Sequence, residues 1–141
     1  MGDTRNDGMF TRPVYNDADI AAYLLVDLRS DGTVRPYVQS SGYICFGSTI
    51  QDSTNDYVTV MGGNVPGSRL LKLDYSETIA CCGPIAHGAT AGTFAPATGS
   101  DVVIGHYIGT DGATSASDAH AICECILYPW AGWADSVFPA T

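Results

Sequence analysis

The chain has 141 residues, of which 45% are hydrophobic, and no apolar run approaches the roughly 20 residues that a membrane helix requires. Six Lys and Arg against fifteen Asp and Glu give a formal charge of −9, which would repel the phosphates of a nucleic acid. The first residues lack the cationic and apolar regions of a secretory signal. We therefore expect one soluble domain, made in a cytoplasm, that binds neither membrane nor nucleic acid directly.

The amino-terminal segment, residues 1–19, is polar, rich in Asn, Asp, Gly and Thr, and shows no helical periodicity. It predicts an extended arm outside the domain. The candidate partner-binding residues on this arm are Arg5, Met9, Phe10, Arg12 and Tyr15. An arm that cannot fold alone is ordered only when another surface receives it, so we expect these side chains to contact a neighbouring chain. The alternative is a frayed terminus.

Residues 20–127 alternate short runs of β-branched and aromatic residues with clusters of turn-forming residues. The expected strands are residues 23–28, 43–46, 57–61, 70–73, 78–82, 102–108 and 120–127. Glycine and proline are spread throughout, which leaves no helix of ordinary length. The pattern predicts an all-β fold, a compact β-barrel or β-sandwich.

The second half of this domain repeats the first at a nearly constant offset, which indicates pseudo-repeats over about residues 20–61 and 79–127. The matched segments are 20–22 with 79–81, 32–36 with 92–96, 44–47 with 102–105, and Asp52 with Asp111. These are turn and strand residues without reactive groups, so the duplication copies architecture and no catalytic site. A unit of two or three strands cannot bury its apolar face alone, and we expect the two copies to close one core.

The five cysteines invite a metal or nucleophile hypothesis, which their spacing disfavours. Adjacent strand residues point to opposite faces, so Cys81 and Cys82 cannot easily share one ion. Cys123 and Cys125 share a face, but free cysteine commonly behaves as a small buried hydrophobe. A cysteine nucleophile also needs a base within reach, and no histidine is assigned to one by the sequence. We therefore expect core thiols, no metal, no cofactor, no catalytic residue and no enzyme activity.

The carboxyl-terminal segment, residues 128–141, is an aromatic tail that contains both tryptophans. Its candidate partner-binding residues are Trp130, Trp133 and Phe138. Proline and glycine forbid a regular strand or helix there. The aromatic side chains therefore either fold back onto the domain or dock on another chain, where Trp is a preferred hot-spot residue.

Three stretches within residues 19–127 resemble the small β-rich head decoration, or capsid cement, proteins of tailed bacteriophages. Residues 19–28 with the Asp-Gly turn in 30–34 look like the opening strand of that family. Gly47 ahead of 56–60 looks like its next segment, and 104–108 followed by 122–127 is similar to its closing pair. The polar arm, the Cys81-Cys82-Gly83-Pro84 stretch and the aromatic tail depart from the family pattern.

The resemblance implies a structural protein on the outer surface of the virion capsid, synthesised in the host cytoplasm. It implies a homotrimer whose partner is the major capsid protein and which stabilises the assembled head by bridging several capsid subunits. The alternative is a monomeric ligand- or carbohydrate-binding β module in which the aromatic residues form a sugar platform. A cysteine- or metal-dependent enzyme is the third hypothesis.

Overall fold

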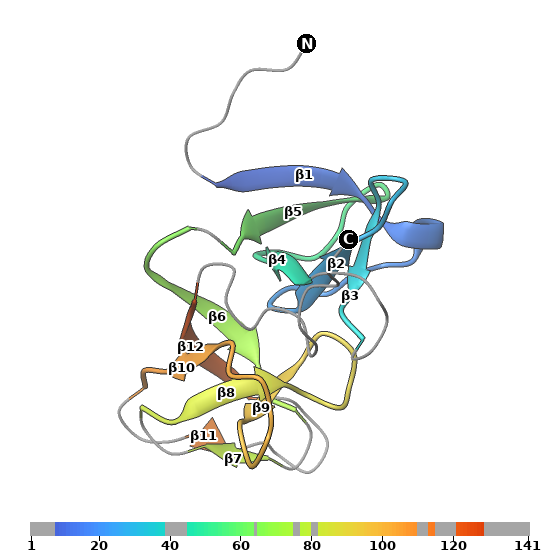
Figure 1. Cartoon of the computed structure of the whole chain (residues 1–141). Helices are drawn as coiled ribbons and strands as arrows, with labels where there is room; N and C mark the ends of the chain where they lie inside the picture. The colour runs from blue at the N-terminus through green and yellow to red at the C-terminus, as the bar shows by residue number, and fades with distance from the viewer. Residues whose placement is uncertain are drawn as a thin grey trace.

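The structure, a computed structural model, confirms the all-β prediction with two antiparallel five-stranded sheets (Figure 1). It describes residues 8–38, 45–63, 65–74, 77–79, 82–109, 113–114 and 121–128. The helical element in this part of the chain is η1 (Tyr15–Asp17), a single 3-10 turn. No helix among the described residues is long and apolar enough to cross a membrane.

The first sheet contains the strands that precede residue 63. They are β1 (Met9–Pro13), β2 (Leu25–Leu28), β3 (Val34–Pro36), β4 (Cys45–Thr49) and β5 (Tyr57–Gly62). Their order in the sheet is β1-β5-β4-β2-β3. The β2–β3 hairpin is followed by a crossover to β4 on the other side of β2.

The second sheet follows the same plan with the order β6-β12-β10-β8-β9. Its strands are β6 (Ser68–Lys72), β8 (Pro84–His87), β9 (Phe94–Pro96), β10 (Gly105–Tyr107) and β12 (Ile122–Leu127). A short pair, β7 (Thr78–Ile79) with β11 (Ala113–Thr114), lies beside it at the far end from β1 (Figure 1). The two sheets are therefore two copies of one five-stranded unit.

The register of the two sheets shows two repeated units, which include β1 and β6 in addition to the predicted residues 20–61 and 79–127. One isolated parallel bridge joins Val14 to Val34 in the first unit, and another joins Leu73 to Phe94 in the second. Each bridge links the strand that opens the unit to its hairpin, so each sheet curls toward a closed barrel. Positions that occupy the same place in the two sheets, such as Val14 and Leu73, are called equivalent below.

Residues 9–13, predicted to lie in an arm outside the domain, instead form β1 and pair with β5 over five residues. Val14, which follows β1, is only 3% exposed and belongs to the core. The domain therefore begins by residue 9 and not at residue 20. The segment is extended as predicted, but its hydrogen-bonding partner is a distant strand of the same chain. Residues 1–7 lie outside the described residues.

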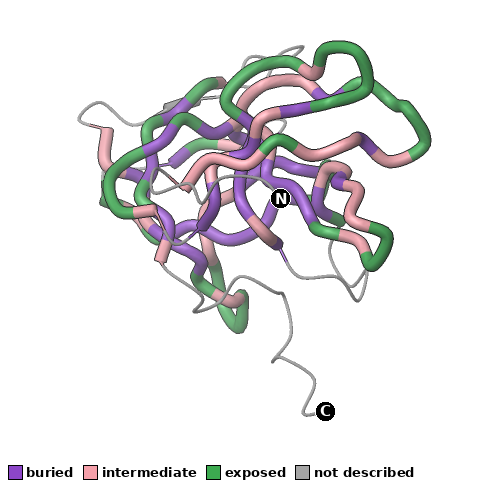
Figure 2. The backbone as a smooth tube through the Cα atoms, turned by 90° about the horizontal axis from the view of Figure 1, so that it is seen from above, coloured by how far each residue is buried: buried purple, intermediate pink, exposed green. Residues whose placement is uncertain are grey.

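Each unit has its own hydrophobic cluster, whereas the sequence predicted one shared core. The first cluster consists of Val14, Ile20, Val26, Val34, Val58 and Val60. Their equivalents in the second cluster are Leu73, Ile79, Ile85, Phe94, Cys123 and Cys125. The second cluster also takes in Leu25, Tyr37 and Cys45 from the first unit. Buried segments gather in the middle of the molecule, and exposed segments lie mostly toward its outside (Figure 2).

Backbone hydrogen bonds and one ring contact join the two units. The Leu25 N–H donates to the Gly92 carbonyl over 2.8 Å, and the Gly92 N–H donates to the Tyr37 carbonyl over 2.8 Å. The Lys72 N–H donates to the carbonyl of Tyr23 over 3.0 Å. The centroid of the Tyr37 ring lies 4.1 Å from that of His87, which is buried in β8.

Arg69 is the side chain that ties the units together most directly. Its guanidinium donates to the Ser48 hydroxyl over 3.2 Å, to the Met61 carbonyl over 2.9 Å and to the Gly62 carbonyl over 3.0 Å. These acceptors lie on β4 and β5 of the first unit, while Arg69 lies on β6 of the second. Burial lowers the pKa of Arg69 to about 10, so the side chain keeps its positive charge at neutral pH.

Candidate functional site

The described cysteines lie mainly in the core. Cys45, Cys123 and Cys125 are buried, whereas Cys82 is exposed. Burial raises the pKa of Cys123 to about 11 and raises those of Cys45 and Cys125 as well, so these thiols stay protonated and unreactive at neutral pH. Within the described residues no three His, Cys, Asp or Glu side chains form a group that could hold a metal ion. Cys81 lies outside the described residues.

Cys123 and Cys125 occupy the positions that Val58 and Val60 occupy in the first unit. Because the first unit has valine at the equivalent positions, the double substitution Cys123→Val and Cys125→Val should change the free energy of unfolding by less than about 1 kcal/mol. Urea unfolding measures the change. A loss above about 2 kcal/mol would show that the thiols have a role beyond filling space.

Tyr15, one of the predicted contact residues, is engaged within its own unit. The Arg29 guanidinium lies 3.9 Å from the centroid of the Tyr15 ring, and that of Arg35 lies 5.9 Å from it. Arg35 also pairs with the fully buried Asp27 over 3.2 Å. Burial raises the pKa of Asp27, and the hydrogen bond and charge of Arg35 oppose that rise. The cluster fastens η1 to β2 and β3.

The other predicted contact residues of the amino-terminal segment lie on β1. Met9 is opposite Met61 of β5, and the ring of Phe10 lies 5.4 Å from that of Phe46. Arg12 is partly buried, and its Nε has no hydrogen-bond partner among the described residues. The structure thus brings Met9, Phe10 and Arg12 together on one strand. Arg5, Trp130, Trp133 and Phe138 lie outside the described residues.

An exposed aliphatic surface on β6 and β12 is the candidate site that sequence reasoning missed. Ile122 and Ile126 are 44% and 38% exposed, and Leu70 on the adjacent strand is 43% exposed. Leu70 lies directly opposite Glu124, midway between the two isoleucines, so the three aliphatic side chains share one face of the sheet. We call Leu70, Ile122 and Ile126 the outer aliphatic face. Lys72, opposite Ile122, borders it.

The alternation along β12 is the signal that could have revealed this face. In Ile122–Leu127, the two cysteines and the leucine are buried, and the residues between them are exposed. Once Cys123 and Cys125 are taken as core residues, the period of two in a strand places Ile122 and Ile126 on the solvent side. An exposed aliphatic group on the edge strand β6 and its neighbour β12, in an acidic protein, is a candidate docking surface.

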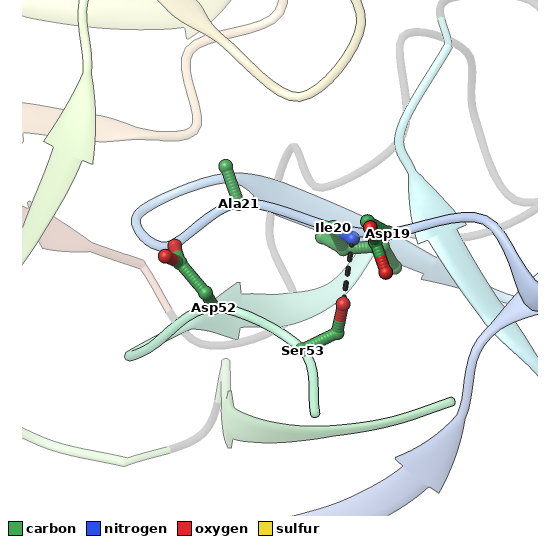
Figure 3. A pocket seen from close by; sticks show the side chains of 5 residues that line it. All are labelled: Asp19, Ile20, Ala21, Asp52 and Ser53. Carbon is green, nitrogen blue, oxygen red and sulfur yellow. Dashed lines mark hydrogen bonds between the residues drawn. The ribbon is translucent and has the colours of Figure 1, made fainter. Parts of the chain in front are cut away.

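An open hollow of about 400 Å³ is lined by Asp19, Ile20, Ala21, Asp52 and Ser53 (Figure 3). The Ser53 hydroxyl accepts a hydrogen bond from the Ile20 N–H over 2.9 Å. Asp52 accepts one from the Ala22 N–H over 2.8 Å. Both side chains therefore fasten the loop before β2 to the loop after β4, which is a structural use of these polar groups.

The fold has a counterpart among solved structures. No protein-family profile matches the sequence, and no curated protein matches it. The crystal structure of the head fiber gp8.5 N base in bacteriophage phi29 matches with a TM-score of 0.53 and 15% sequence identity. The match covers 86% of this chain and 93% of that chain. The chain therefore shares its two-unit β fold with a base segment of a phage head fiber.

Proposed function

We propose that this chain is a structural protein of a phage virion that attaches to the outer surface of the head. The observation that carries the proposal is the fold match to the head fiber base, which extends over both units of this chain. The resemblance of residues 19–127 to head decoration proteins points the same way. In this role the protein binds the major capsid protein, bridges adjacent capsid subunits and stabilises the assembled head.

The outer aliphatic face is the docking surface that we favour for capsid contact. Its three branched side chains are already exposed on a rigid sheet, so burying them against a partner costs little ordering entropy. The surrounding protein has a net charge of −9, which favours a capsid surface that carries basic residues around an apolar centre. Met9, Arg12 and the residues of the carboxyl-terminal tail are further contact candidates.

Substituting the outer aliphatic face should separate attachment from folding. The triple variant Leu70→Thr, Ile122→Thr and Ile126→Thr keeps β-branched or strand-compatible residues at exposed positions, so the fold should remain intact. We expect at least about a tenfold weaker attachment to heads that lack the protein, which corresponds to about 1.4 kcal/mol. Co-sedimentation of the purified protein with such heads measures it.

The matched control is Val103→Thr, because Val103 is also an exposed aliphatic residue but lies outside β6 and β12. The control should bind heads as wild type does. Full-strength attachment by the folded triple variant would eliminate the outer aliphatic face as the capsid contact. Failure of the wild-type protein to bind any head preparation would instead count against the proposed function itself.

We further propose a homotrimer, because three copies that engage neighbouring capsid subunits gain affinity through effective concentration. Light scattering across a dilution series measures the native mass. A stable mass of three chains supports the trimer. A single-chain mass at every concentration, combined with normal head attachment, would reject the trimer while leaving the attachment intact.

A further inference from the structure

We propose that Pro13 and Pro84 prevent this chain from joining to further copies through the contact that joins its own two units. A chain made of two equivalent units has two complementary surfaces. The first unit uses one surface internally and the second unit uses the other, which leaves an unused copy of each at opposite ends. Such a head-to-tail contact between molecules generates open filaments unless its rotation closes a ring.

Pro84 stands where the first unit has Leu25. Val26 and Ile85 lie opposite Pro36 and Pro96, respectively, so the residues that precede them are equivalent. The Tyr37 N–H donates to the Leu25 carbonyl over 2.9 Å, and the same bond recurs from the Ala97 N–H to the Pro84 carbonyl over 2.9 Å. The Leu25 N–H is a donor between the units, whereas a proline has no N–H to donate.

Pro13 stands where the second unit has Lys72. Val14 and Leu73 form the two equivalent parallel bridges, and Pro13 and Lys72 immediately precede them. Lys72 donates its N–H to the carbonyl of Tyr23 in the other unit. At the equivalent position proline again removes the donor. Thus both amide donors that flank the junction are replaced by proline on the surfaces that face other molecules.

The remaining polar contacts of the junction are lost in the same way. Phe10 is equivalent to Arg69 and supplies none of the guanidinium donors that bind three acceptors of the first unit. Gly32 is equivalent to Gly92, but its N–H already donates to the Arg29 carbonyl over 2.9 Å. Every polar donor of the internal junction that we identify therefore lacks a working equivalent at the outer surfaces.

Apolar side chains are nevertheless exposed at two positions equivalent to buried residues of the junction. Val103, equivalent to the buried Cys45, is 36% exposed, and Leu28, equivalent to the buried His87, is also 36% exposed. Such exposed apolar side chains would favour association of copies in the absence of a block. Proline on strands is a known means of preventing unwanted pairing, because it removes a donor without adding charge.

The test restores the missing amides one surface at a time. Pro84→Leu restores the donor at one end, and Pro13→Lys restores the donor at the other, each with the residue type found in the equivalent position. We expect each single variant to keep the wild-type mass in analytical ultracentrifugation. We expect an equimolar mixture of the two to form larger species, because only unlike copies then offer two restored surfaces to each other.

The double variant should associate without limit, with a weight-average mass that rises with concentration beyond about twice that of wild type. Pro96→Ala is the control, since it removes a proline that has a proline equivalent, Pro36, and it should leave the mass unchanged. Circular dichroism verifies folding, and Pro84→Ala replaces Pro84→Leu if the latter unfolds. A folded double variant with the wild-type mass up to millimolar concentration would overturn the proposal. Head binding is measured separately, so this result does not depend on the capsid role.

Discussion

Replacing Arg69 with methionine should lower the free energy of unfolding by about 3 kcal/mol or more. The substitution keeps an unbranched apolar side chain in the space but removes the donors to Ser48, Met61 and Gly62. Each of the three acceptors left without a partner costs roughly 1–3 kcal/mol, and together these costs exceed what is regained by no longer burying a charge. Because these bonds cross the junction, the loss weakens the docking of one unit on the other.

Urea unfolding followed by circular dichroism measures this effect. Lys72→Met is the matched control, because Lys72 is a cation on the same strand whose side chain makes no buried hydrogen bond that we identify, and we expect less than about 1 kcal/mol. Arg69→Lys should retain the charge but lose most of the stability that the Arg69 side chain contributes. An ammonium group cannot reach three separated acceptors as a planar guanidinium does. Equal stability of the Met variants at positions 69 and 72 would contradict the role of Arg69 in the junction.

The parts of the fold that the sequence predicts correctly are those with local signals. Residues 32–36 and 92–96 share a Gly-Thr opening and a closing proline, and in both the glycine has a positive φ, +85° for Gly32 and +80° for Gly92. A turn that needs this backbone conformation keeps its glycine through divergence. The cysteines of β12 were likewise identified as core residues because a thiol is a small apolar group.

The parts that the sequence does not reveal depend on partners far along the chain. β1 and β6 are equivalent strands, yet Met9–Pro13 and Ser68–Lys72 have no residue type in common at matching positions. Each becomes a strand because it pairs with β5 or β12 of its own unit. Arg69 could not be recognised as buried either, because its acceptors are carbonyl groups that only the folded junction brings together.

The two units keep the same residue at some interior positions. Glycine persists in the interior of each, since Gly47 lies opposite Val26 and Gly105 lies opposite Ile85. The first unit has Phe10 at the position equivalent to Arg69. The agreement in the interior reflects the packing of the shared strand plan.

Replacing Gly105 with alanine should lower the free energy of unfolding by about 3 kcal/mol, and Gly47→Ala should do the same in the first unit. A methyl group on Gly105 would overlap the Ile126 carbonyl oxygen of β12, and one on Gly47 would overlap the Met61 carbonyl oxygen of β5. In both cases the obstacle is backbone in a hydrogen-bonded ladder, which cannot turn aside as a flexible side chain can.

Gly32→Ala separates this steric effect from the general cost of removing glycine. Gly32 has a positive φ but open space around it, so alanine there should cost only the conformational strain of about 1–2 kcal/mol. Thermal and urea unfolding should therefore rank Gly105→Ala and Gly47→Ala as more destabilising than Gly32→Ala. Because the two interior glycines lie in different units, their losses should be close to additive in the double variant. A ranking with Gly32→Ala as the most damaging would refute the close approach of β4 to β5 and of β10 to β12.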